Sequence, residues 1–205
     1  AMREASTDVT TRKDASRSWE FQRPRQPSTK YIAVPRVSSE SRDYVPIAWF
    51  APEVILTDAA FAIDKAPLWL FGVLCGRPFN LWNKAVSGRL ESRVRISNTI
   101  TYNNYPFPSL TSFERAALDA AAQSVLDARD SHPGASLADL YASSTMPVDL
   151  RKAHEQLDKL ILAAYGLGRE SDEATILGVL FERYAEVTEG LLHKPKATRK
   201  RKVTT

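Results

Sequence analysis

Charged and hydroxyl side chains gather in two short segments of the first half of the chain. Arginine can donate a bidentate pair of hydrogen bonds to guanine, glutamate can accept one from cytosine, and serine can do either or hold a phosphate. A purely electrostatic patch would avoid glutamates, so the mixed signs favour a surface that contacts base edges. The segments PRVSSESRDY and RLESRVRIS supply the candidates Arg36, Ser38, Ser39, Glu40, Arg42, Arg89, Glu91, Arg93 and Arg95.

The second of these segments alternates between polar and apolar side chains. If residues 89–96 form one strand, three arginines and Glu91 lie on a single face, because successive side chains of a strand point to opposite faces. A charged edge strand that resists aggregation has the same pattern, and periodicity alone favours that interpretation. Lys84, next to Trp82 and Asn83, fits either interpretation and is a further candidate for DNA contact.

Other kinds of chemistry have little support in the sequence. His132, His154 and His193 are far apart, and none has a Cys or His partner at metal-ligand spacing. The chain has no GxSxG elbow, no phosphate-binding glycine loop and no GxGxxG motif. We therefore expect no metal site, no cofactor site and no catalytic residue in this segment. His154 lies beside an apolar helix stripe, where we expect it to hydrogen-bond or to pack at a domain contact.

Charge is unevenly distributed along the 205 residues. The net charge is +4, but residues 19–108 carry 11 basic and 7 acidic side chains, residues 109–192 carry 7 and 14, and residues 193–205 carry 6 basic and no acidic ones. A basic region can displace the counterions of DNA, and this displacement supplies most non-specific affinity. Only the first of these regions and the tail are therefore expected to bind a polyanion.

The composition, with 43% hydrophobic and 25% charged residues, is that of a globular protein. No apolar run is long enough for a membrane helix or suited to a signal peptide, so we expect a cytoplasmic protein without membrane contacts. The single cysteine, Cys75, lies within LWLFGVLC, which excludes an internal disulfide and indicates a buried side chain. Burial is also expected for Trp19, Trp49 and Trp69.

Four segments are expected along the chain, and together they give an α+β fold. Residues 1–18 form a flexible lead or linker. Within residues 19–108, the runs 30–34, 44–50 and 54–57 predict a small mixed sheet, followed by helices over 66–75 and 79–86. Pro106 and Pro108 end this part. Residues 109–192 form an all-α acidic helical domain, and residues 193–205 form a disordered basic tail that either tethers nucleic acid or only improves solubility.

Capping residues and apolar stripes define the helices of the second half. The capping residues are Thr111 with Glu114, Ser136 with Asp139, Pro147 in a first turn, and Ser171 before the last helix. Apolar side chains at helical spacing predict the buried faces. One stripe comprises Leu150, Ala153, Leu157, Leu160, Ile161 and Ala164, and the other comprises Ile176, Leu177, Leu180, Phe181 and Tyr184.

Several strings together resemble one family between Trp19 and Leu191. They are PRVSSESRDYVPIAWF, LFGVLCGRPFNLWNKAVSGRLESRVRISNTITYNNYPFP, LYASSTMPVDLRKAHEQLDKLILAAYG and LFERYAEVT. In this order they resemble the target-recognition and C-terminal helical domains of MmeI-like DNA methyltransferases. In that family one polypeptide joins an adenine-specific N6 methyltransferase, often with a nuclease, to a recognition domain.

The resemblance implies a role within a larger enzyme. The parent would bind S-adenosylmethionine in a preceding domain and extrude an adenine from the duplex to methylate it. This segment would hold double-stranded DNA against that methyltransferase core and contact flanking bases, mainly in the major groove. The methylase motif Asn/Asp-Pro-Pro-Tyr/Phe is absent, and NNYPFP does not replace it. The segment itself is therefore not expected to catalyse methylation or cleavage.

A second class of function competes with DNA recognition. The acidic helical half would dock onto another domain of a larger enzyme, and the chain would be a protein-interaction module without direct base contacts. In that case the apolar stripe between Leu150 and Ala164 would stay partly exposed in this chain.

Overall fold

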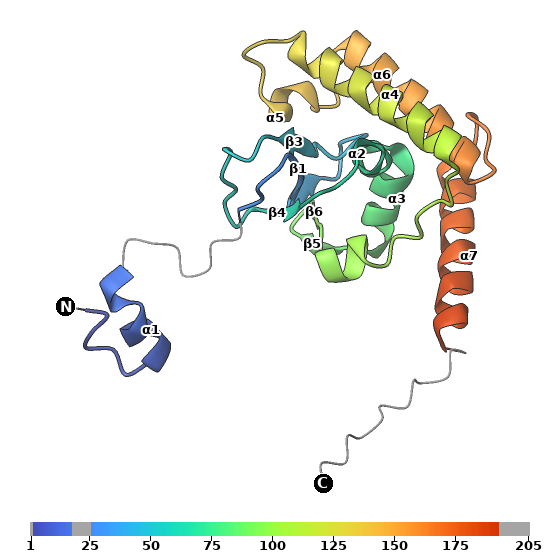
Figure 1. The fold of residues 1–205 in the computed structure, drawn as a ribbon. Coiled ribbons are helices and arrows are strands. Elements are labelled where there is room, and N and C mark those ends of the chain that lie inside the picture. Colours follow the sequence, from blue (N-terminus) through green and yellow to red (C-terminus); the bar gives the residue numbers. More distant parts are fainter. Residues whose placement is uncertain (1, 18–25, 193–205) are drawn as a thin grey trace.

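The computed structural model describes residues 2–17 and 26–192, apart from the side chains of residues 191 and 192. Two small sheets and the helices α2 and α3 form one part, over which the longer helices α4 and α6 lie, with α7 along the side (Figure 1). The α+β class predicted from the sequence is confirmed. Trp19, His193 and the predicted basic tail lie outside the described residues.

The first sheet is built around one strand that is covered on both sides. Strand β1 (Tyr31–Pro35) pairs antiparallel with β3 (Ala48–Phe50) and β4 (Ala60–Ile63). Four of its five residues are buried, as its uninterrupted apolar sequence requires. Ile32 and Val34 join the main core, whereas Tyr31 and Ala33 pack in a smaller cluster with Ala48.

Two of the strand predictions in this region are wrong. In the run 44–50 only the last three residues form a strand, because Ile47 N–H bonds back to the Val45 carbonyl across Pro46. The run 54–57 is irregular, and β4 takes the place expected for it. The Val54 carbonyl accepts hydrogen bonds from Tyr31 Oη and Gln26 Nε2, so side chains occupy a group that a strand would use.

The second sheet lies next to the first. It comprises β2 (Val37–Ser39), β6 (Arg93–Arg95) and β5 (Gly88–Leu90), antiparallel and in that spatial order. The backbone of Arg36 connects the two sheets, since its N–H donates to the Ala59 carbonyl at 2.8 Å and its carbonyl accepts from Ile96 N–H at 2.9 Å. The strands thus form two antiparallel sheets instead of a single sheet.

Both predicted helices of the first half are present, as α2 (Leu68–Cys75) and α3 (Arg77–Val86). Cys75 is fully buried as expected, and burial raises the pKa of its thiol to about 11. Trp49 and Trp69 are only partly buried. A π-helical turn, η2 (Asn98–Tyr102), follows the second sheet. Near the start of the chain, α1 (Val9–Lys13) and η1 (Ala15–Arg17) have no buried residue.

The helices of the second half begin largely where the capping residues predict. Helix α4 (Ser112–Asp130) has the capping box of Thr111 and Glu114, and the short α5 (Leu137–Leu140) has that of Ser136 and Asp139. Helix α6 (Val148–Ala164) has Pro147 as its N-cap and not in its first turn. Helix α7 (Glu173–Leu192) is capped by Asp172 and not by Ser171, because Asp172 Oδ1 accepts from Thr175 N–H at 2.8 Å.

One cluster of buried apolar residues extends from Ile32 in β1 to Leu180 in α7. Helix α4 packs between α2 and α6, and α7 packs against α3. The α6 stripe is only in part buried: Leu150, Leu157 and Ile161 have no exposed surface, whereas Ala153, Leu160 and Ala164 are partly exposed. One core is shared by residues before and after Pro108. The division of the chain into two domains near Pro108 stays a prediction. Among the described helices, none is long and apolar enough to cross a membrane.

Candidate nucleic-acid interface

Residues 88–95 form a β-hairpin, so the prediction of one continuous strand is wrong. Strands β5 and β6 pair directly with each other, and Leu90 is the partner of Arg93. The chain reverses at Glu91 and Ser92, where Glu91 has a φ of 57°. A two-residue hairpin turn needs this left-handed backbone. Polar and apolar residues alternate in both arms, and for this reason the pattern resembles that of a single strand.

The reversal separates the three arginines into two groups. Arg93 and Arg95 lie on one face of the second sheet, on either side of the buried Val94. Arg89 is the cross-strand partner of Val94 and therefore belongs to the opposite face. Arg89, Glu91, Arg93 and Arg95 are nevertheless all exposed. The expected set of three arginines on one face becomes a pair, Arg93 and Arg95, beside the turn that carries Glu91.

Ion pairs orient two of these guanidinium groups. Arg93 Nη2 lies 2.8 Å from Glu91 Oε2 at the tip of the hairpin. Arg89 Nη1 lies 3.0 Å from Glu40 Oε1 in the loop that follows β2, and Arg89 Nη2 donates to the Lys84 carbonyl at 3.3 Å. Side chains of the two candidate segments, residues 35–44 and 89–97, are thus in contact through Arg89 and Glu40. The ion pairs are solvent-exposed, so a ligand can compete for the arginines at low cost.

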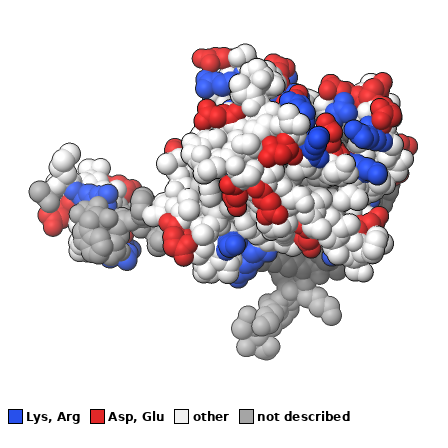
Figure 2. Space-filling view, turned by 90° about the horizontal axis from the view of Figure 1, so that it is seen from above, with Lys and Arg blue, Asp and Glu red and all other residues white. Residues whose placement is uncertain are grey.

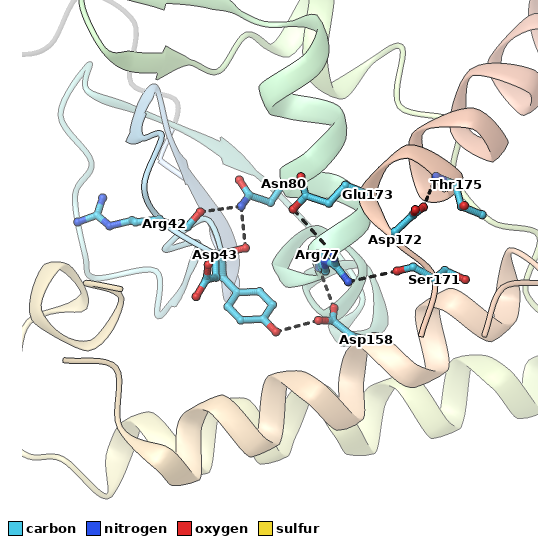
Figure 3. Close-up of polar contacts among 10 residues, drawn as sticks. Arg42, Asp43, Arg77, Asn80, Asp158, Ser171, Asp172, Glu173 and Thr175 are labelled. Carbon is cyan, nitrogen blue, oxygen red and sulfur yellow. Dashed lines mark hydrogen bonds and ion pairs between the residues drawn. The ribbon is translucent and has the colours of Figure 1, made fainter. Parts of the chain in front are cut away.

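The loop candidates have different degrees of access. Arg36 and Glu40 are exposed, and Ser39 is half-buried, with its Oγ 2.9 Å from Ser41 Oγ. Ser38 is only 3% exposed and its hydroxyl has no hydrogen-bond partner among the described residues, so it faces the interior and not a ligand. Arg42 is half-buried in a loop that Asn80 holds through hydrogen bonds from Nδ2 to the carbonyls of Arg42 and Asp43, at 3.0 and 2.7 Å (Figure 3).

Lys84 lines an open polar pocket of about 280 Å³ next to this loop. The pocket also contains two arginines that sequence reasoning missed, Arg77 at the start of α3 and Arg151 in α6. Arg77 lies 3.8 Å from Glu173 and Arg151 lies 3.2 Å from Asp43. No short-range spacing signals this arrangement, since the helices that carry the two arginines are far apart in sequence.

A buried carboxylate fixes the wall of the pocket. Asp158 Oδ1 accepts from the backbone N–H of Arg77 at 2.7 Å, and Asp158 Oδ2 accepts from Tyr44 Oη at 2.8 Å (Figure 3). Burial raises the pKa of Asp158 to about 6, although both hydrogen bonds act in the opposite direction. The carboxylate occupies the N-terminus of α3, where an anion is stabilised. It therefore has a structural role that connects α6, α3 and the loop.

His154 packs in the interior, as the sequence analysis expected. Its Nε2 lies 2.6 Å from Tyr141 Oη and its ring stacks on Tyr44 at 4.1 Å. Burial lowers its pKa to about 3, so the ring is neutral at ordinary pH. Tyr141 also accepts from Arg129, whose Nη1 donates to the Ile47 carbonyl at 2.8 Å. Arg129, Tyr141 and His154 are all buried, so this network belongs to the protein core.

The upper, helical face of the molecule carries acidic and basic side chains interspersed, without a continuous basic area (Figure 2). Within residues 2–17 and 26–192, no three His, Cys, Asp or Glu side chains are grouped so as to hold a metal ion. The candidate residues for nucleic-acid contact lie on the hairpin, in the loop after β2 and in the pocket beside Lys84.

Comparisons with known proteins show which family this chain resembles. A family model for the MmeI target recognition domain matches residues 1–109, and one for the MmeI C-terminal domain matches residues 111–192. DNA methyltransferase A of Bacillus subtilis (strain 168) is 39% identical over 188 residues, which cover 91% of this chain and 21% of that protein.

A solved structure of the type IIL restriction-modification enzyme MmeI in complex with DNA is also similar, with a TM-score of 0.82 and 37% sequence identity. The match covers 91% of this chain and 25% of that one. The chain therefore spans a quarter or less of the length of these relatives. The resemblance predicted from the sequence is confirmed: the chain belongs to the MmeI target recognition domain family and continues into that family's C-terminal domain.

Proposed function

We propose that this chain is the DNA-recognition module of a restriction-modification methyltransferase, which reads double-stranded DNA and presents it to a catalytic core in the same polypeptide. Three findings support the proposal: the family, the relative named as a DNA methyltransferase, and the similar structure solved with DNA. The structural observation that carries it is the pair Arg93 and Arg95, exposed on one face of a hairpin.

A two-stranded ribbon has the right size for the major groove, where all four base pairs differ. Arg93 and Arg95 point the same way from alternate positions of β6, and each can donate two hydrogen bonds to a guanine. Glu91 at the tip can accept from a cytosine when Arg93 turns to a base. Within the proposal, Arg36, Arg42, Lys84 and Arg89 contact phosphates, and Ser39 and Glu40 line the same surface.

Ser38 was also expected to contact DNA, but its burial removes it from the proposed interface. In its place the pocket residues Arg77 and Arg151 extend the interface. Because Arg151 belongs to α6, the C-terminal domain contributes directly to phosphate binding and is more than a support.

The parent enzyme would transfer a methyl group from S-adenosylmethionine to the exocyclic N6 of an adenine. The adenine must leave the base stack, since its amine cannot be reached within the duplex. The role of this chain is to hold the flanking base pairs while that happens. In this proposal the cofactor site and the catalytic residues belong to the core of the parent enzyme, which we place in the cytoplasm with the DNA it modifies.

Affinity measurements at several salt concentrations test the proposal with the 205-residue chain and fluorescent duplexes. The logarithm of the binding constant should fall against the logarithm of salt concentration with a slope of about −0.9 per phosphate contacted. Arg93→Ala and Arg95→Ala should weaken binding. Arg115→Ala serves as the control, because this exposed arginine lies on α4, over the Trp69 ring and outside the proposed interface. No binding at about 20 mM salt, or equal losses in all three variants, would overturn the proposal.

The competing function, a protein-interaction module without base contacts, depends on an exposed α6 stripe. The large residues Leu150, Leu157 and Ile161 of that stripe are buried, and α6 packs against α2 and α4. No observation on the described residues therefore favours this second function over DNA recognition.

A further inference from the structure

One buried threonine forms hydrogen bonds with the residues at both ends of the β5–β6 hairpin. Thr101, in η2, has no exposed surface. Its Oγ1 lies 2.6 Å from Ser87 Oγ and accepts from the backbone N–H of Ser97 at 3.1 Å. Ser87 immediately precedes β5, and Ser97 is two residues beyond the end of β6. A single hydroxyl group thus contacts the chain at both ends of the hairpin.

The directions of these hydrogen bonds follow from the number of protons available. Ser87 Oγ donates its one proton to Asn83 Oδ1 at 2.6 Å. Thr101 must then donate to Ser87, while the Thr101 oxygen accepts from Ser97. The result is a chain of three hydrogen bonds that all point the same way, from Ser97 through Thr101 and Ser87 to Asn83 on α3. Asn83 is fully buried, and such chains are reinforced at low dielectric.

The π-helical turn that carries Thr101 is itself fixed to α3. Trp82, which is 2% exposed, donates from Nε1 to the Thr101 carbonyl at 3.1 Å. The backbone N–H groups of Thr101 and Tyr102 both bond to the Ser97 carbonyl, at 2.9 and 3.0 Å. Single π turns are rare and occur often at functional sites. Here the turn brings one side-chain hydroxyl between the two ends of the hairpin.

The outer strand β5 has further polar contacts only through the exposed side chain of Arg89, within the described part of the chain. All three residues of β5 are exposed, and among the described strands β5 pairs with β6 alone. Base contacts tolerate displacements of only about 0.5 Å, so the direction in which the hairpin leaves the protein determines what its arginines can reach.

We propose that Thr101 is a positioning residue, which fixes the hairpin against α3 and thereby sets the base preference of Arg93 and Arg95. The inference rests on the proposed function, because it concerns how the DNA-reading side chains are held. Thr101 itself is buried and does not contact DNA.

Thr101→Val tests this role, since valine has nearly the same shape but no hydroxyl group. The measured quantity is the ratio of two dissociation constants of the 205-residue chain: one for an unrelated duplex, and one for a duplex of equal length that the unaltered chain selects from a random library. Thr101→Val should lower this ratio by about tenfold, comparable to one lost base contact, while affinity for the unrelated duplex stays unchanged. Thr101→Ser keeps the hydroxyl and should restore the ratio.

Thermal unfolding of each variant separates a shifted hairpin from a lost fold. If Thr101→Val does not fold, Ser87→Ala tests the same series of hydrogen bonds. This substitution removes the hydroxyl between Thr101 and Asn83 and leaves Ser97 N–H paired with Thr101. Unchanged ratios in Thr101→Val and in Ser87→Ala would overturn the inference and leave the proposed function intact. An unaltered chain that selects no duplex would overturn the proposed function and the inference together.

Discussion

Arginines serve opposite purposes in two regions of this molecule. On the hairpin, Arg93 and Arg95 are exposed, and Arg93 forms an ion pair with Glu91, an exposed glutamate at the tip. Inside the molecule, Arg129 is 8% exposed and is held by the Ile47 carbonyl, by Tyr141 Oη and by the faces of Phe71 and Tyr141. The first arrangement leaves donors free for a ligand, and the second uses them within the fold.

The difference shows that residue type alone does not identify a binding site. A buried guanidinium requires partners that replace its water, and Arg129 obtains them from β-strand, helix and loop segments at once. An exposed guanidinium with an exposed carboxylate partner keeps much of its hydration and can exchange that partner for a base or phosphate. The following predictions address this contrast, from the largest expected effect to the smallest.

Replacement of Arg129 should have the largest effect on stability. Arg129→Met leaves the Ile47 carbonyl without its 2.8 Å donor and Tyr141 without its charged partner. We expect the free energy of unfolding to fall by about 3 kcal/mol, the cost of breaking a buried charged hydrogen-bond set. Urea denaturation measures this loss. Arg169→Met is the control and should change stability by less than about 0.5 kcal/mol; equal losses in both variants would contradict the contrast.

Two buried groups, Asp158 and His154, should have opposite effects on how the free energy of unfolding depends on pH. The folded pKa of Asp158 is raised to about 6 from 3.8, so its contribution to stability is greatest below pH 4 and falls as pH rises toward 6. The folded pKa of His154 is lowered to about 3 from 6.5, so its contribution rises as pH rises from 3 to 6.5. Between about pH 4 and 6 the two slopes nearly cancel.

Replacement of either residue should leave the effect of the other on the pH dependence of the free energy of unfolding. Relative to the unaltered chain, Asp158→Asn should gain stability with rising pH by about 1 kcal/mol per pH unit between pH 4 and 6, and His154→Gln should lose it at a similar rate. Urea denaturation at several pH values gives both slopes, and groups common to all chains cancel in the differences. Parallel pH profiles for the three proteins would show that these groups do not titrate as buried groups.

Substitutions on the hairpin should change base preference and not stability. Arg93→Lys keeps the positive charge but loses the planar pair of donors. We expect it to bind unrelated duplexes as the unaltered chain does, with a loss of about 1 to 3 kcal/mol in discrimination at one base pair. Competition binding with single-base variants of a selected duplex measures the effect. A uniform loss across all duplexes would assign Arg93 to a phosphate instead of a base.

The smallest effect is expected for an exposed ion pair. Glu40→Gln removes the carboxylate that lies 3.0 Å from Arg89. Because exposed ion pairs contribute little, the free energy of unfolding should change by less than about 0.5 kcal/mol. Affinity for duplex DNA at low salt should rise slightly, as Arg89 gains freedom and one negative charge is lost. If Glu40→Gln lost more stability than Arg129→Met, the exposed ion pair and not the buried arginine would stabilise the fold, which would contradict the account.

Local signals in the sequence predict much of this fold. The capping boxes at Thr111 and Ser136 locate helix starts, because they depend on contacts three residues apart. The apolar stripe of α6 predicts its buried face for the same reason. Strand β1 follows from its uninterrupted apolar run. These features are encoded within single segments and need no knowledge of the tertiary structure.

The sequence suggests candidate residues for the site, but it does not give their arrangement. Alternation over residues 89–96 cannot distinguish one strand from two arms joined by a two-residue turn, so the position of Arg89 was wrong. Ser38 and Arg129 are buried through contacts with segments distant in sequence, and Arg77 meets Arg151 only because α3 packs against α6. Such encounters depend on tertiary packing, and no spacing within the chain indicates them.

Amide hydrogen exchange of the 205-residue chain, with and without duplex DNA, tests most directly which region binds. We expect DNA to slow exchange in residues 88–95 and in the loop 36–42, while amides of α4 and the second half of α7 exchange at the same rates as before. Protection confined to α4 and α7, with the hairpin unaffected by DNA, would contradict the account.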